Sequence, residues 1–119
     1  MLEYTTLVNT LLKYQTAFEL LVAKRYPGAT ISILDVNTLV NDIYNTPTDF
    51  FPEEQGKAFN VTGFYHACDF TGSNCVNNAA PVDTFLWYDQ LHPTQTTMSV
   101  VAREFVGVVE GTSKYGLYF

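Results

Sequence analysis

The sequence predicts an α/β fold with a parallel sheet, to which this chain contributes two strands. Residues 29–34 form a short run rich in β-branched side chains, and this run lies between two stretches with the apolar spacing of amphipathic helices. Residues 84–88 form a second apolar run, and another helical pattern follows it. Helices that alternate with strands in this way are typical of a parallel sheet covered by helices.

Residues 2–25 predict an amphipathic helix, because their apolar side chains recur every three or four residues. Lys24 and Arg25 fall in the last turn, where positive charge complements the negative end of the helix dipole, and Pro27 and Gly28 end the pattern. We expect this helix to pack on a sheet. Its apolar stripe comprises Tyr4, Leu7, Val8, Leu11, Phe18, Leu21 and Val22.

Residues 29–34 predict the first strand, and Asp35 follows it directly. A second helix is expected to begin near Asp35 or Asn37, either of which can cap free N–H groups, and to end before Pro47. Asp35 also lies where parallel sheets bind ligands, although a helix cap is the more common role for such a residue. The side chains expected to face inward are Val36, Leu39, Val40 and Ile43.

Residues 46–81 predict mostly loop, because residues that break regular structure interrupt every longer pattern. These include Pro47, Pro52, Gly56, Gly63, Gly72 and Pro81. Aromatic side chains in this stretch either pin a long loop to a core or line a cleft. They are Phe50, Phe51, Phe59, Phe64, Tyr65 and Phe70.

Cys68 and Cys75 are the two cysteines of the chain, and they either form a disulfide or remain as buried thiols. We predict the disulfide, because it would constrain a glycine-containing loop with little regular structure. His66 adds a third candidate metal ligand, but the spacing of the three is unfamiliar and a structural zinc site needs four. We therefore expect no metal.

Residues 84–88 predict the second strand, which ends at Asp89 and His92. The helix after it is expected to run from about Thr94 until Gly111 caps it. Residues 114–119 are rich in aromatic side chains and either dock on the fold or fray. The expected inward face of the last helix comprises Met98, Val101, Ala102, Phe105 and Val109.

Composition and charge exclude several classes of partner. At 119 residues and 47% apolar content the chain can form the core of one small domain. Its formal charge of −6, with no basic cluster beyond Lys24 and Arg25, argues against nucleic acid and anionic membranes. No run of apolar residues is long enough to span a bilayer. The first residues also lack the pattern of a secretory signal.

Asp89 and His92 form the most informative pair in the sequence. A carboxylate that accepts one ring N–H of a histidine fixes its tautomer and leaves the other nitrogen free to act as a general base. The Asp-x-x-His spacing allows this contact within one turn, and Pro93 helps to fix the chain just after it. By themselves the two residues favour the more common case, a loop aspartate bonded to a nearby histidine without catalysis.

The block Asp89-Gln90-Leu91-His92-Pro93-Thr94, preceded by residues 85–88, closely resembles the last sequence block of the GDSL, or SGNH, hydrolases. Residues 26–39, the triplet at Asn60 and the two cysteines also resemble the second half of that family. The likeness is nearest to its secreted fungal acetylesterase and lipase-like branch. It covers essentially the whole chain, so residues 1–119 are expected to form the C-terminal segment of a single SGNH hydrolase domain.

The resemblance implies a flavodoxin-like, three-layer fold in which residues 29–34 and 84–88 are the last two strands of a parallel sheet. It also implies that His92 is the general base of a Ser-His-Asp triad and that Asp89 orients it. The family's Gly-Asp-Ser block and its two oxyanion-hole blocks do not occur here. None of the four serines, Ser32, Ser73, Ser99 and Ser113, lies in such a block, so this chain is expected to supply no nucleophile.

The function implied is hydrolysis of a carboxylic ester of a small molecule or carbohydrate, with acetylated sugars favoured over long-chain lipids and with no cofactor. The alternative is a catalytically inactive remnant that binds carbohydrate or nothing. Asn60-Val61-Thr62 is an acceptor sequence for N-glycosylation, and with the cysteines it favours secretion, a signal peptide having been lost with the missing half. The oligomeric state does not follow from the sequence.

Overall fold

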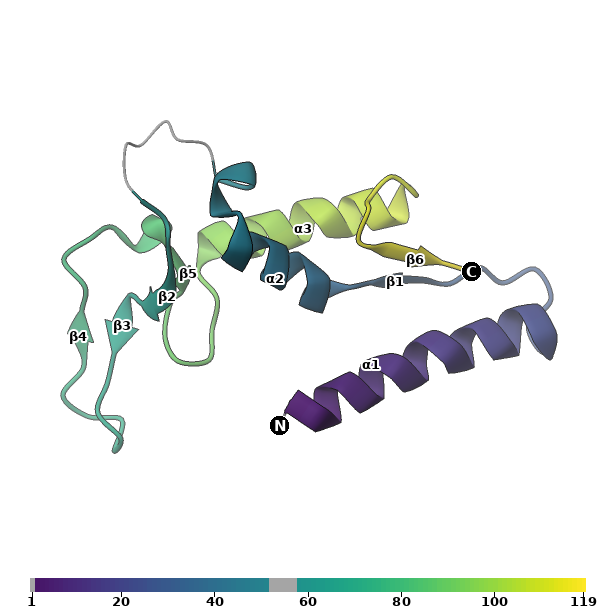
Figure 1. The fold of residues 1–119 in the computed structure, drawn as a ribbon, viewed down its shortest axis with the longest axis horizontal. Helices are drawn as coiled ribbons and strands as arrows, with labels where there is room; N and C mark the ends of the chain where they lie inside the picture. Colours follow the sequence, from purple (N-terminus) through teal and green to yellow (C-terminus); the bar gives the residue numbers. More distant parts are fainter. Residues whose placement is uncertain (1, 52–57) are drawn as a thin grey trace. The chain divides into compact units, whose positions relative to one another are not determined.

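The computed structural model describes residues 2–51 and 58–119 (Figure 1). They divide into two units. One unit contains the chain up to Asp35 together with Glu104–Phe119, and the other contains Val36–Arg103. Pro52 and Gly56, two of the predicted loop residues, lie outside the described residues. The helices of the described part lack the combination of length and apolar character that a bilayer-spanning helix requires.

The first unit begins with α1 (Leu2–Ala17), which continues into the π-helical turn η1 (Phe18–Val22). The turn is wider than an α-turn because Ala23 N–H donates to the carbonyl of Phe18, five residues earlier. Arg25 N–H donates to the Glu19 carbonyl and closes the end of the turn. Arg25 also forms an ion pair with Glu19, at 3.2 Å between Nε and Oε2. The helix predicted over residues 2–25 is therefore confirmed as far as Val22.

The prediction that this helix packs on a sheet through its apolar stripe is wrong for the described chain. The seven side chains of the stripe are all at least half exposed, from 50% at Val8 to 77% at Tyr4. The sheet of this unit pairs only β1 (Ser32–Leu34) with β6 (Gly116–Tyr118). A strand of this length spans about 10 Å, whereas α1 is about 24 Å long, so the sheet is too small to cover it.

The exposed stripe of α1 leads us to expect that the isolated chain self-associates, because contiguous apolar surface of this extent is rarely left in water. Sedimentation velocity from about 1 to 100 µM should show the mean sedimentation coefficient rising with concentration. The double variant Leu7→Glu, Leu11→Glu should shift this rise to higher concentration, since both side chains are more than half exposed. A strict monomer over the whole range would contradict the expectation.

The strand predicted at residues 29–34 is shorter than expected and has a different partner. β1 pairs antiparallel with β6, with Ile33 opposite Leu117, and mutual backbone hydrogen bonds between Ile31 and Phe119 extend the ladder. The parallel pairing with residues 84–88 is therefore not formed. The C-terminal residues form a strand instead of fraying, because these backbone groups find partners in β1.

Ser113 organises the connection between α3 (Gln95–Val109) and β6. Its hydroxyl donates to the Glu104 carboxylate at 2.8 Å and accepts from Tyr115 N–H at 3.1 Å. The Tyr118 hydroxyl donates to its carbonyl. Gly111, at φ +74°, ends the helix in a conformation that favours glycine, as predicted.

The second unit is built around a parallel strand pair. β2 (Asn60–Phe64) lies beside β5 (Phe85–Trp87), and α2 (Val36–Asn45) contacts β2 (Figure 1). Its buried apolar side chains are Leu39, Ile43, Phe85, Leu86 and Val100. The molecule is thus a mixed α/β structure containing a parallel pair, although the pair is not the one predicted.

The stretch 46–81 contains more regular structure than the sequence indicated. Its described residues include the short 3-10 turn η2 (Pro47–Asp49), strand β2, and a two-stranded antiparallel sheet of β3 (His66–Ala67) and β4 (Val76–Asn77). The 3-10 turn η4 (Val82–Thr84) then leads into β5. β2 was missed because Asn60 and Gly63 are typical turn residues. In the structure Asn60 Oδ1 accepts from Gly63 N–H at 2.7 Å, inside an irregular stretch of the ladder.

The helix faces were predicted with unequal success. Leu39 and Ile43 of α2 are fully buried as expected, but Val36 is 41% exposed. In α3 the expected inward face is wrong: Met98, Phe105 and Val109 are exposed, whereas Thr97, Val100 and Val108 are buried. α3 carries apolar residues on most of its circumference, so their spacing alone did not determine which face points inward.

Candidate functional site

The Asp89–His92 segment is a tight turn directly after β5. Tyr88 N–H donates to the His92 carbonyl at 2.8 Å, and Trp87 forms an isolated antiparallel bridge with Pro93. The chain thus reverses within a few residues and returns alongside the strand that it has just left. The end of β5 therefore holds both side chains at one place.

Asp89 is the hydrogen-bond centre of this turn. Its Oδ1 accepts from the backbone N–H groups of Leu91, at 2.8 Å, and His92, at 2.7 Å. The His92 ring nitrogen Nδ1 lies 2.9 Å from Asp89 Oδ2 and 3.1 Å from Oδ1. An ionised carboxylate can only accept, so Nδ1 carries a proton, and in the neutral ring the free lone pair is then on Nε2. This is the tautomer that a general base requires.

Hydrogen bonds keep Asp89 ionised. The His92 side chain, followed by the backbone N–H groups of His92 and Leu91, lowers the pKa of Asp89 to about 2. The pair is open to solvent, with side-chain exposures of 67% for His92 and 29% for Asp89. Hydrogen bonds, and not burial, therefore hold the carboxylate in place.

Two buried threonines that the sequence analysis did not single out anchor the turn to the next helix. The Thr94 hydroxyl donates to the Phe85 carbonyl at 2.7 Å and accepts from Thr97 N–H at 3.3 Å. The Thr97 hydroxyl donates to the Leu86 carbonyl at 2.9 Å. A threonine at a helix start, as at Thr94, is a recognisable capping signal. These bonds fix the start of α3 against β5 and so fix the position of His92.

Two of the four serines have hydroxyl groups that donate to neighbouring groups. Ser99 donates to the Gln95 carbonyl at 2.9 Å within α3, and Ser113 donates to Glu104. The first bond lies within a helix, and the second joins the loop after α3 to that helix.

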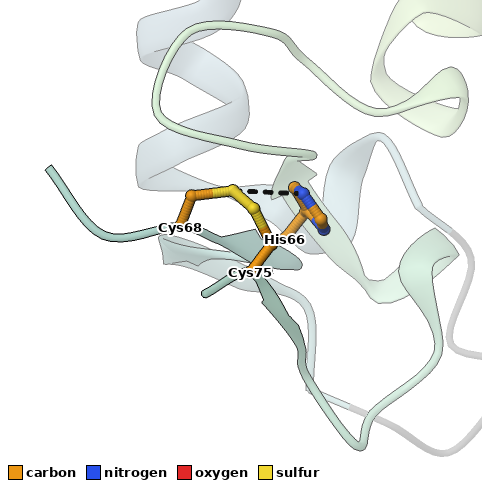
Figure 2. Close-up of side chains that lie close together, drawn as sticks. All are labelled: His66, Cys68 and Cys75. Carbon is orange, nitrogen blue, oxygen red and sulfur yellow. Dashed lines mark hydrogen bonds between the residues drawn. A yellow bond between two sulfur atoms is a disulfide. The ribbon is translucent and has the colours of Figure 1, made fainter. Parts of the chain in front are cut away.

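Cys68 and Cys75 form the predicted disulfide, and His66 lies beside it (Figure 2). One donor atom from each of the three residues lies within 4.8 Å of the others. Sulfur in a disulfide lacks the negative charge that makes a thiolate a metal ligand, so the oxidised cluster is unsuited to a metal.

The loop between the two cysteines is organised by Asp69. Its carboxylate accepts hydrogen bonds from the Thr71 hydroxyl at 2.6 Å, Asn74 Nδ2 at 2.7 Å and Ser73 N–H at 2.9 Å. These bonds, led by that from Thr71, lower the pKa of Asp69 to about 2. The sequence analysis did not identify this role, although an aspartate with Thr, Gly and Ser two to four residues later is typical of a turn.

The disulfide gives a direct expectation for protein secreted by a eukaryotic host. Mass spectrometry without reduction should find the peptides containing Cys68 and Cys75 joined, with the chain two hydrogens lighter than its reduced form. Two free thiols in such material, detected by alkylation before digestion, would contradict the structure.

Comparison with known proteins finds a relative of this chain. The chain is similar over its whole length to an acetylesterase. That protein, from Hypocrea jecorina, is 44% identical over 119 residues, which cover 100% of this chain and 33% of the relative. No protein-family model matches the chain. The chain therefore spans about a third of the relative's length and resembles a segment of an acetylesterase.

Proposed function

We propose that this chain supplies the general base and its orienting carboxylate to a carboxylic ester hydrolase of the GDSL, or SGNH, type. The observation that carries the proposal is the Asp89–His92 contact, which leaves Nε2 of His92 as the free base. The similarity to an acetylesterase supports the same chemistry. The nucleophilic serine and the oxyanion donors would come from sequence corresponding to the part of the relative that this chain does not match.

In this mechanism His92 Nε2 takes the proton of the serine hydroxyl as the serine oxygen attacks the ester carbonyl. It then returns that proton to the leaving alcohol, and in the second half-reaction it activates water in the same way. Asp89 accepts the Nδ1 proton throughout and stabilises the imidazolium that forms. The acyl group is acetyl, as the relative's name suggests, and acetylated sugars are the favoured substrates.

The same proposal extends to the fold. β2 and β5 would be parallel strands in the larger sheet of a flavodoxin-like, three-layer fold, and this chain would be the C-terminal segment of that domain. Their pairing and the position of Asp89 after β5 support it, because parallel sheets bind ligands at the carboxyl ends of their strands.

The test is complementation. The chain is refolded together with the unmatched part of the Hypocrea jecorina acetylesterase and assayed with 4-nitrophenyl acetate. Neither piece alone should hydrolyse the ester faster than the background rate, whereas the mixture should hydrolyse it catalytically. A parallel refolding with the relative's own matching segment is the positive control.

Two outcomes would count against the proposal. If the relative's own segment restores turnover and this chain does not, the chain is the inactive remnant named as the alternative. If this chain hydrolyses the ester unaided and His92→Ala leaves that activity intact, the assignment of the site is wrong. The expected result, turnover only in the mixture, supports the role of the Asp89–His92 pair.

We also propose that the protein is secreted, and the disulfide supports this because such bonds persist in oxidising compartments. Expression in a eukaryotic secretory host should then attach a glycan to Asn60, at the start of β2. Digestion with an N-glycosidase should lower the mass and convert Asn60 to aspartate. A mass that the enzyme leaves unchanged, as is expected of the Asn60→Gln control, would contradict the prediction.

A further inference from the structure

The two sulfur atoms of the disulfide have different surroundings. Cys75 is exposed, whereas Cys68 is half-buried and its Sγ lies 3.3 Å from Nε2 of His66 (Figure 2). An external thiol can therefore reach Cys75 more easily. The sulfur next to the imidazole is the better leaving group when the ring is an imidazolium, because its Nε2 proton then stabilises the thiolate that forms.

The imidazole is held in the orientation that this role requires. The Asn77 side-chain oxygen lies 2.6 Å from His66 Nδ1, and the two residues are opposite each other in the β3–β4 ladder. An amide oxygen can only accept, so Nδ1 carries a proton and Nε2 is directed at Cys68. The ring also stacks on Tyr88, with centroids 5.5 Å apart and planes inclined by 13°.

We propose that this disulfide is a thiol-exchange site that reacts with low-molecular-weight thiols at Cys75 and uses His66 as the acid and base for Cys68. The thiolate of the external thiol attacks Cys75 Sγ and forms a mixed disulfide there. The Cys68–Cys75 bond breaks, its electron pair goes to Cys68 Sγ, and the Nε2 proton of the His66 imidazolium neutralises that thiolate.

The reverse step uses the same atoms. In the mixed disulfide, neutral Nε2 accepts the proton of the Cys68 thiol, and the resulting thiolate attacks Cys75 Sγ. The external thiol leaves as a thiolate, and the original disulfide is restored. The nitrogen that favours opening therefore also favours closure, so the site exchanges rapidly in both directions.

The experiment uses the full chain and reduced glutathione. The reaction is stopped with acid after the first exchange, free thiols are alkylated, and peptides are mapped by mass spectrometry. We expect glutathione on Cys75 and the alkyl group on Cys68. Glutathione on Cys68, or an equal distribution between the two cysteines, would overturn the proposal, and this readout needs no variant.

His66→Phe tests the imidazole, because it keeps an aromatic ring for stacking on Tyr88 and removes both nitrogens. We expect its rate of mixed-disulfide formation to fall by roughly tenfold, less than a buried general acid typically contributes, since the site is partly open to water. Asn77→Ala should slow exchange by a smaller factor, and Asn77→Asp, whose carboxylate also accepts the Nδ1 proton, should restore it. Exchange at the unaltered rate in His66→Phe would overturn the role of His66.

Discussion

His92→Ala is expected to lower kcat of the complemented esterase by about 10⁴-fold or more, to the level of the oxyanion hole and binding alone. The reason is that Nε2 of His92 is the proposed proton acceptor for the serine, and the Asp89 contact holds it in the required tautomer. KM should change little, since the imidazole acts on the serine and not on the bound ester. Initial rates with 4-nitrophenyl acetate measure the effect.

Asp89→Asn provides the finer test of the same pair. The asparagine oxygen can still accept the N–H groups of Leu91 and His92, so the turn should survive, but its amide can donate to Nδ1. The ring proton would then move to Nε2 and the base would be lost. We expect a loss of kcat of about 10⁴-fold, as for the corresponding change in serine proteases.

Asp69→Asn is the matched control, because Asp69 is also an aspartate in a turn and hydrogen bonds lower its pKa to about 2. Its carboxylate accepts from Thr71, Ser73 and Asn74 and does not contact a histidine. It should leave kcat within about twofold of the wild type, since it removes one charge without touching the base. A loss in Asp69→Asn equal to that in Asp89→Asn would mean that the pair has no special role. So would activity in His92→Ala within tenfold of the wild type.

Phe85→Ala is expected to lower the free energy of unfolding by about 3–5 kcal/mol. Phe85 is 1% exposed at the centre of the second unit, and its ring meets the edge of the Tyr65 ring at 6.0 Å between centroids. Truncation removes this buried apolar surface and leaves a cavity beside β2. The loss is a large fraction of the stability of an ordinary small domain.

Urea denaturation, at a concentration where the chain is monomeric, measures this change. Phe70→Ala is the control, because Phe70 is fully exposed in the disulfide loop and its removal should change stability by less than about 0.5 kcal/mol. Equal effects of the two substitutions would show that the parallel β2–β5 pair does not form the core. A destabilised Phe85→Ala variant should also lose complementation, since β5 holds Asp89 and His92.

Features that depend on neighbouring residues were predictable from the sequence. The three-residue spacing of Asp89 and His92 places both side chains on one turn, and the structure forms the bond that the spacing allowed. The helices at Val36–Asn45 and Gln95–Val109 follow from their apolar periodicity and end signals. The disulfide followed from two cysteines separated by a short loop.

Features that depend on distant parts of the chain were decided only by the tertiary structure. Pairing of β1 with β6 and of β2 with β5 depends on which backbone groups find partners, and a strand's own residues do not specify its neighbour. The inward face of α3 is set by the bonds from Thr94 and Thr97 to β5, because the helix is apolar on most sides. The β3–β4 pairing places Asn77 opposite His66, so the spacing of His66, Cys68 and Cys75, taken alone, could not show the contact that orients the imidazole.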